Sequence, residues 1–189
     1  GMHGVFKDMN DAINASIEAQ KKVCTMTLDQ REQIISLIRK KTHENAEILA
    51  NMGVNETGMG NVGDKILKHH LTADKVPGTE DISTIAWSGD RGLTLVEMGP
   101  FGVIGAITPA TNPSETVICN CIGMLAGGNT VVFNPHPNAK KTTIYTINMI
   151  NEASIEAGGP DNIAVTVEAP TLDTSAIMMK HPSIHLLVA

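Results

Sequence analysis

The sequence predicts an α/β protein in which amino-terminal helices are followed by part of a parallel sheet flanked by helices. Two observations carry this prediction. Apolar residues recur at helical spacing over roughly the first seventy residues, and short apolar runs alternate with helical segments after Gly99. We therefore divide the chain into a helical segment (1–76), a connecting segment with some β-structure (77–98) and a partial α/β domain (99–189).

The helical segment is expected to contain three helices. Apolar side chains between Met9 and Ile17 share one helical face, which predicts the first helix. Thr27 and Gln30 have the spacing of a capping box, so a second helix should begin there, and we expect it to end at Gly53. A third, shorter helix is expected from Val62 to Ala73.

The second half of the chain has the alternation of short apolar strands and helices that is typical of a parallel sheet. Residues 77–92 indicate a connection rich in Gly, Asp and Ser, and residues 93–98 have a weak strand pattern. The expected strands are then Gly102–Ile107, Thr130–Phe133, Ile163–Val167 and Ile184–Ala189, and the expected helices are Ser114–Leu125, Lys140–Ala157 and Thr171–Lys180. Such alternation indicates right-handed βαβ units. No segment follows the last apolar strand to cover its apolar side chains, so we expect the chain to be truncated there.

Composition excludes several classes of partner. The formal net charge is −6, no basic stripe is visible, and one Trp, one Tyr and three Phe offer little to stack on bases, so we expect no nucleic acid partner. No stretch has the length of a membrane span and no signal core is visible, so we expect no membrane partner. The spacing of the three cysteines suits neither a disulfide framework nor a zinc ribbon, which favours a reducing, cytoplasmic compartment.

The cysteines and most histidines are poor candidates for chemistry. Cys119 and Cys121 lie within an apolar helical stretch, and we expect them, like Cys24, to be buried and inert. No histidine spacing suits a metal site, so the histidines are expected to be ordinary surface residues. His136 is the exception, because it follows the second strand of the sheet, at the edge where ligands bind.

The turn after the first strand of the sheet carries the most information. It contains Thr111 and Asn112 between two prolines, at the carboxyl edge of the expected sheet. Thr and Asn side chains at that edge can donate hydrogen bonds to a developing oxyanion. The tripeptide Thr-Asn-Pro is also a common turn, and taken alone the residues leave both interpretations open.

At this point the sequence resembles a known family. Residues 97–109 (EMGPFGVIGAITP) and 128–135 (GNTVVFNP) are similar to the entry and the second strand of the Rossmann-like cofactor domain of aldehyde dehydrogenases. The sequences of residues 108–113 (TPATNP) and 133–137 (FNPHP) resemble those of the coenzyme A-acylating branch of this family, which includes the ethanolamine- and propanediol-utilisation enzymes. Residues 56–60 (ETGMG) and 89–94 (GDRGLT) are similar to the same branch.

The resemblance implies a reaction and its cofactors. A cysteine thiolate attacks a small aldehyde, NAD takes the hydride, and coenzyme A releases the acyl group as a thioester. The family's nucleophilic cysteine lies further along than Ala189, so the 189-residue chain alone is expected to be inactive. A gapless match places Thr111 at the family's oxyanion-holding Asn, with Asn112 one residue later, and which of the two faces the site stays open.

The resemblance also points to the cofactor site. Its candidate residues follow the first two strands of the sheet: Thr108, Pro109, Ala110, Asn134, Pro135 and His136. Ordinary members have a Lys and a Glu where this chain has Asn134 and Pro137. Loss of the Lys favours NAD over NADP, and the altered pocket leaves room for coenzyme A to use the same adenosine site in turn.

Three hypotheses remain at this stage. The first is a fragment of an NAD-dependent acylating enzyme. The second is a non-catalytic nucleotide-binding or assembly module, and the third is a non-acylating aldehyde dehydrogenase. The resemblance further implies a homo-oligomer in the full-length parent and allows association with a bacterial microcompartment.

Overall fold

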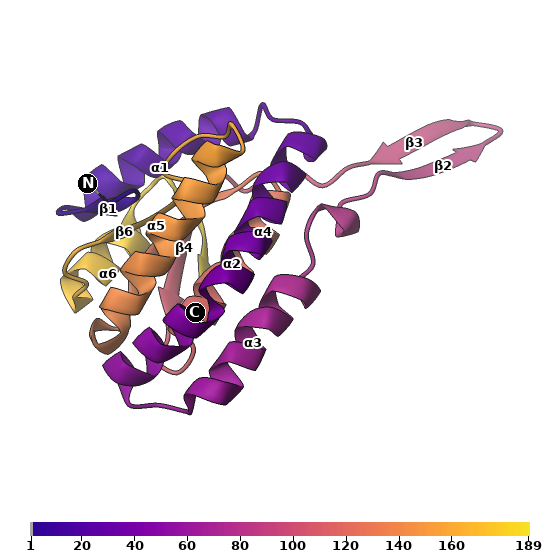
Figure 1. Ribbon diagram of the computed structural model, residues 1–189. Coiled ribbons are helices and arrows are strands. Elements are labelled where there is room, and N and C mark those ends of the chain that lie inside the picture. Colours follow the sequence, from indigo (N-terminus) through magenta and orange to yellow (C-terminus); the bar gives the residue numbers. More distant parts are fainter. Residues whose placement is uncertain (1) are drawn as a thin grey trace.

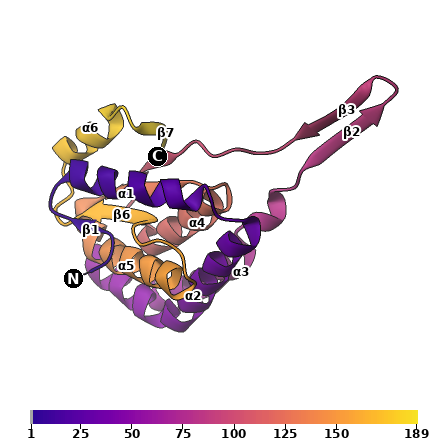
Figure 2. The same ribbon diagram turned by 90° about the horizontal axis from the view of Figure 1, so that it is seen from above.

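The strands and helices form layers, with one ribbon standing away from them. The computed structural model describes residues 2–189. A five-stranded parallel sheet lies between helices, and a two-stranded ribbon projects from one side (Figures 1 and 2). The predicted α/β fold class, with a parallel sheet flanked by helices, is confirmed.

The sheet has the strand order β1-β6-β5-β4-β7, and every neighbouring pair is parallel. Its strands are β1 (Val5–Phe6), β4 (Val103–Thr108), β5 (Thr130–Pro135), β6 (Ala164–Val167) and β7 (Ile184–Val188). From β4 the chain moves through β5 to β6, and then returns to place β7 on the other side of β4. In such a sheet ligands bind beyond the carboxyl ends of the strands, near the point where the direction reverses.

The helices cover both faces of the sheet. Their bounds are α1 (Met9–Val23), α2 (Leu28–Thr57), α3 (Val62–Lys75), α4 (Pro113–Ala126), α5 (Lys140–Glu156) and α6 (Leu172–Lys180). The helices α1 and α6 pack on one face and α4 and α5 on the other, with α2 across α4 and α5 and α3 beside α2 (Figure 2). The amino-terminal helices therefore contribute to the cores on both sides of the sheet.

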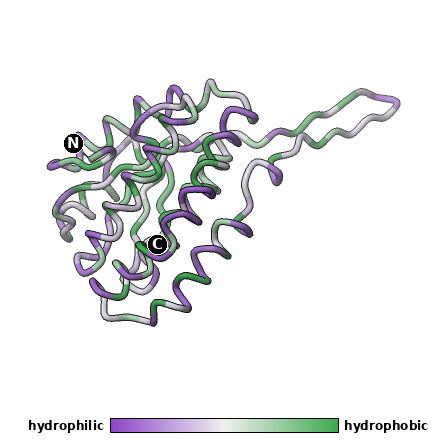
Figure 3. Tube along the Cα trace, viewed as in Figure 1, coloured by the Kyte–Doolittle hydropathy of each residue, from purple (hydrophilic) through white to green (hydrophobic). Residues whose placement is uncertain are grey.

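Alternation along the strands divides the core into two parts. In β5, Val131 and Phe133 belong to the cluster beneath α2, α4 and α5, whereas Val132 belongs to the cluster beneath α1 and α6. This is the pattern expected where successive side chains point to opposite faces and both faces are covered. Figure 3 shows the strands at the centre of the molecule as largely hydrophobic.

The second helix is longer than the sequence indicated. The capping box at Thr27 and Gln30 is present, so the predicted start is confirmed. The predicted end at Gly53 is wrong, because α2 continues to Thr57 and is terminated by Gly58 in a left-handed conformation with φ of 69°. Gly53 is buried inside the helix instead.

The prediction of an irregular connection over residues 77–92 is also wrong in part. Residues Ile85–Gly89 form β2, which pairs antiparallel with β3 (Gly92–Val96) through a tight turn at Asp90 and Arg91. All residues of both strands are exposed. Because neither face of the ribbon packs on a core, its sequence does not show the alternation of apolar and polar residues that reveals a half-buried strand. The two-residue strand β1 was missed because it is too short to show a period.

Candidate functional site

A cleft lies at the carboxyl edge of the sheet, where the topology places a ligand. Its volume is about 410 Å³. The cleft is lined by the ends of β4 and β5, by the first turn of α6 and by the residue after β7: Ile107, Thr108, Pro109, Asn134, Pro135, His136, Pro137, Thr171, Leu172, Ser175 and Ala189. No acidic or basic side chain other than the imidazole of His136 lines it.

Thr108 supplies an unsatisfied polar atom to this cleft. The residue is 1% exposed, and its Oγ1 has no hydrogen-bond partner among the described residues. Its carbonyl is occupied, since it accepts a hydrogen bond from the amide of His136 at 3.1 Å. Buried hydroxyls are ordinarily paired, so a lone one that lines a cleft is suited to bind a polar group of a ligand.

Asn134 and His136 instead build the walls of the cleft. The Asn134 Oδ1 accepts a hydrogen bond from the Thr174 hydroxyl at 2.7 Å, which ties the end of β5 to the first turn of α6. The exposed His136 accepts the amide proton of Asn138 on its Nδ1 at 3.1 Å. This bond places the imidazole proton on Nε2 when the ring is neutral.

The structure separates the two sets of candidate residues. Of the six cofactor candidates, Thr108, Pro109, Asn134, Pro135 and His136 line the cleft, and Ala110 does not. The two oxyanion candidates, Thr111 and Asn112, also lie outside it.

A second hollow, the α3–α4 groove, adjoins Asn112. Its volume is about 330 Å³, and its lining residues are Lys68, Leu71, Thr72, Asn112, Glu115, Thr116, Cys119 and Asn120. The Asn112 Oδ1 accepts a hydrogen bond from the Lys68 ammonium at 3.3 Å, and no described residue accepts from its amide nitrogen. Thr111 is exposed, and its backbone carbonyl accepts a hydrogen bond from Lys65 at 2.9 Å.

A buried polar cluster beneath this turn was missed by the sequence reasoning. It consists of Lys65 and His69 on α3 and Ser114 and Glu115 in the first turn of α4. The expectation that His69 is a surface residue is wrong, since its ring is fully buried and its Nε2 lies 2.7 Å from the Ser114 hydroxyl. The four-residue spacing of Lys65 and His69 places them on one helical face, which is the one available signal.

The cysteines differ in burial, contrary to expectation. Cys121 is buried as predicted, whereas Cys24 and Cys119 are exposed. Cys24 caps the end of α1 beyond its buried face, and Cys119 lies on the side of α4 that lines the α3–α4 groove. Partial desolvation by neighbouring atoms raises the pKa of the exposed Cys119 thiol, and full burial raises the pKa of the Cys121 thiol, so neither cysteine favours the nucleophilic thiolate.

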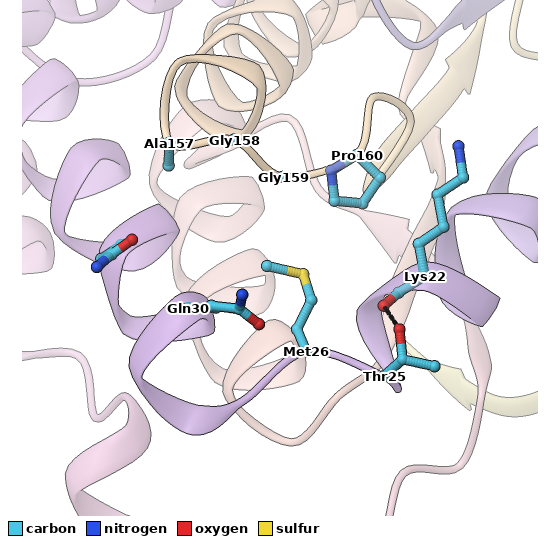
Figure 4. Close-up of a pocket in the computed structure, with 9 residues that line it drawn as sticks. Lys22, Thr25, Met26, Gln30, Ala157, Gly158, Gly159 and Pro160 are labelled. Atoms are coloured by element: carbon cyan, nitrogen blue, oxygen red, sulfur yellow. Dashed lines mark hydrogen bonds between the residues drawn. The ribbon is translucent and has the colours of Figure 1, made fainter.

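A larger hollow lies at the opposite edge of the sheet. Its volume is about 570 Å³, and it separates the end of α1 and the first turn of α2 from the loop Ala157–Pro160 (Figure 4). That loop leads into β6, so the hollow faces the amino ends of the strands. Because parallel sheets of this kind bind ligands at the carboxyl edge, the smaller cleft is the better candidate.

Two features are absent from residues 2–189, a metal-binding cluster and a membrane-spanning helix. No group of three or more His, Cys, Asp or Glu side chains in this part of the chain is arranged to hold a metal ion. None of its helices combines the length and the apolar character needed to span a bilayer.

Comparison with known proteins gives one consistent result. The model of the aldehyde dehydrogenase family matches residues 3–189. An acetylating acetaldehyde dehydrogenase from Bilophila wadsworthia is 49% identical over 100% of this chain and 38% of its own length. The chain thus spans about two fifths of the curated relatives that it matches.

Solved structures agree with the sequence matches. A propionaldehyde dehydrogenase from the fucose-utilisation bacterial microcompartment of Clostridium phytofermentans is 70% identical, with a TM-score of 0.97 over 99% of this chain and 43% of that one. A propionaldehyde dehydrogenase from Rhodopseudomonas palustris, solved with bound coenzyme A and an acylated cysteine, is 46% identical, with a TM-score of 0.96 over 98% of this chain and 43% of that one.

Proposed function

The chain belongs to the aldehyde dehydrogenase family, and on this premise we propose that it is part of an NAD(P)-dependent, coenzyme A-acylating aldehyde dehydrogenase for short aldehydes. Relatives that match nearly the whole of this chain are acetylating or CoA-propanoylating dehydrogenases, which supports assignment to the acylating branch. The observation within the chain that carries the proposal is the cleft at the carboxyl edge of the sheet, with the unpaired Thr108 hydroxyl in its wall.

The cleft suits the adenosine part of both cofactors. Pro109, Pro135, Pro137 and Leu172 offer apolar walls to a flat base, and Thr108 offers a buried hydroxyl to a polar atom of the ribose or base. No carboxylate lines the cleft, so a ribose phosphate would meet no repulsion there. We propose that NAD(P) and coenzyme A occupy this cleft in turn.

Asn112 is the better of the two candidates for holding the reacting oxygen. Its Oδ1 is already held by Lys68, which leaves the amide nitrogen free to donate a hydrogen bond. Bound NAD(P) would accept the hydride and coenzyme A the acyl group, while the task of this chain is to orient the aldehyde and stabilise negative charge on its oxygen. The α3–α4 groove beside Asn112 is the proposed path for the aldehyde.

The exposed ribbon of β2 and β3 supports a homo-oligomer. Trp87, Leu93 and Leu95 are 58%, 65% and 59% exposed, on strands that no other part of the described chain covers. Exposed apolar surface of this kind marks an interaction site. We propose that the ribbon packs against another subunit, and that the assembled protein associates with a bacterial microcompartment. The microcompartment origin of the Clostridium phytofermentans relative supports the second point.

The reaction is tested with the complete protein that contains this chain. Propionaldehyde, NAD and coenzyme A are mixed with it, and NADH is followed by absorbance while propionyl-CoA is measured by chromatography. We expect both products in equal amounts and little NADH without coenzyme A. Free propionate without a coenzyme A requirement would show a non-acylating enzyme, and binding of nucleotide without NADH formation would show a non-catalytic module.

The isolated 189-residue chain provides a control for the same assay. We expect it to form no NADH, because the thiol pKa values of the buried Cys121 and of the exposed Cys119 both lie above the ordinary value. Activity of this chain that disappears in Cys119→Ala would contradict the assignment of the nucleophile to another part of the protein.

A further inference from the structure

The turn that carries Asn112 is held from below by buried charged and polar side chains. Lys65 is 3% exposed and Glu115 is 7% exposed, and both lie where α3 meets the first turn of α4. Ionised side chains are almost never buried to this extent unless each has a partner. The two must therefore be considered together.

Lys65 contacts both its charge partner and the turn. Its Nζ lies 3.5 Å from the Glu115 Oε1 and donates a hydrogen bond to the Thr111 carbonyl at 2.9 Å. That carbonyl belongs to the peptide bond that leads directly into Asn112. A charge-assisted hydrogen bond in a buried place thus fixes the orientation of the peptide immediately before the proposed oxyanion donor.

His69 and Ser114 reinforce the same junction. The His69 Nδ1 lies 2.6 Å from the Lys65 carbonyl and must donate to it, because a carbonyl only accepts. Burial lowers the pKa of His69 and favours the neutral ring, so its Nε2 accepts the proton of the Ser114 hydroxyl at 2.7 Å, a shorter contact than the 3.2 Å from that hydroxyl to the Glu115 Oε2. This bond joins the first turn of α4 to α3. The turn that precedes α4 is held by Lys65, which is paired with Glu115.

The Asn112 side chain has little support of its own, although its backbone carbonyl accepts a hydrogen bond from the Thr116 amide at 3.1 Å. Asn112 precedes α4 with φ of −140° and ψ of 67°, and its side chain makes no capping bond to the helix. Its contact with Lys68 is made at an exposed position and is long, at 3.3 Å. A donor that is displaced by about 1 Å can lose roughly a hundredfold in rate.

We infer that Lys65 and Glu115 are positioning residues that hold the Thr111 peptide and thereby aim the Asn112 amide at the reacting oxygen. The inference rests on the proposed function. The simpler alternative is that the pair only stabilises the packing of α3 on α4. The two are separable, because a buried pair can be removed together with less loss of stability than when one partner is left alone.

The test compares five variants of the complete protein in the propionaldehyde assay. Lys65→Met leaves Glu115 unpaired, and Lys65→Met combined with Glu115→Gln removes both charges. Lys65→Arg keeps the charge and the donors. Lys75→Met is the matched control, because Lys75 is an exposed residue of the same helix. Asn112→Ala sets the loss expected when the oxyanion donor itself is removed.

We expect the melting temperature to fall in Lys65→Met and to recover largely in the double variant. In the double variant kcat should nevertheless stay roughly ten- to a hundredfold low, with KM for the aldehyde within about twofold of wild type. Lys65→Arg should recover most of kcat, and Lys75→Met should change neither quantity. A crystal structure of the double variant should show the Thr111 carbonyl moved.

The outcomes that overturn the inference are distinct from failure of the proposed function. A double variant with wild-type kcat, or with an unmoved Thr111 carbonyl, would show that the pair is only structural while the acylating activity stands. A wild-type protein that forms no acyl-CoA would refute the proposed function, and the inference would fall with it.

Discussion

At the scale of single residues, two buried polar side chains at one sheet edge have opposite roles. The Asn134 amide is satisfied by the first turn of α6, where Thr174 donates to its Oδ1 at 2.7 Å. The Thr108 hydroxyl, in the neighbouring strand, has no partner among the described residues. A satisfied group serves the fold, whereas an unsatisfied one that lines a cleft reduces stability unless a ligand completes it.

This difference predicts the effect of Thr108→Val. The hydroxyl makes no hydrogen bond to lose in the free protein, so the free energy of unfolding should be unchanged or rise by up to about 1 kcal/mol. Binding of NAD and coenzyme A should weaken roughly three- to tenfold, the worth of one hydrogen bond. Urea denaturation and isothermal titration calorimetry on the complete protein measure the two quantities.

Thr174→Val is the matched control for that experiment. Its hydroxyl donates to Asn134 and also accepts the Thr171 amide at 2.8 Å, so its removal should lower the free energy of unfolding by about 1–2 kcal/mol. If Thr108→Val costs as much stability as this control and leaves cofactor affinity intact, the Thr108 hydroxyl has a partner within the protein and no role in the cleft.

At the scale of elements, the end of α2 shows how a glycine can mislead. Gly53 and Gly58 are both reasonable helix stops in sequence, but only Gly58 has the left-handed backbone, with φ of 69°. Gly53 is helical, and a methyl group there would lie 3.8 Å from the Lys65 Cδ, at ordinary contact distance. A glycine terminates a helix only where the backbone beyond it turns left-handed, and spacing alone does not show this.

The two glycines should therefore respond oppositely to alanine. Gly53→Ala should stabilise the protein by about 0.5–1 kcal/mol, because alanine loses less backbone entropy in a helix. Gly58→Ala should destabilise it by about 1 kcal/mol, since a side chain disfavours the left-handed conformation. Thermal and urea denaturation of the two variants measure the difference, and a loss of stability in Gly53→Ala would show that its buried site has no room for a methyl group.

At the scale of the whole molecule, the projecting ribbon is the part least explained by the chain itself. It stands away from the sheet and the helices in both views, and its strands contain hydrophobic stretches (Figures 1, 2 and 3). A two-stranded hairpin alone is only marginally stable in water. Its exposed apolar side chains would stabilise the ribbon if a second molecule buried them.

This reasoning predicts that Trp87→Ser and Leu93→Ser weaken subunit association. Each removes an apolar side chain whose burial is worth about 1.5–3 kcal/mol, equivalent to roughly a ten- to hundredfold rise in the dissociation constant. Sedimentation of the complete protein across a concentration series measures this. The control is Leu67→Ser, which removes an equally exposed leucine, 68% exposed, from α3. Equal effects of the three variants would show that the ribbon is not the interface.

The sequence by itself determined most elements and the family. The capping box at Thr27, the starts of α1 and α3 and the strands β4 to β7 depend on residues that are close in sequence, so spacing reveals them. The turns that carry the candidate site residues also follow from local sequence, because they come directly after the apolar runs of β4 and β5. The likeness over residues 97–137 pointed to the family before any coordinates.

Only the tertiary structure decided which of those residues share a cavity and which polar groups are buried. Lys65 reads as a surface lysine until α3 meets a turn that lies 46 residues further along the chain. The apolar neighbours of Cys119 in sequence predict a buried side chain, but its side of α4 faces a groove. Burial depends on which distant segments pack together, and helical or strand periodicity carries no information about that choice.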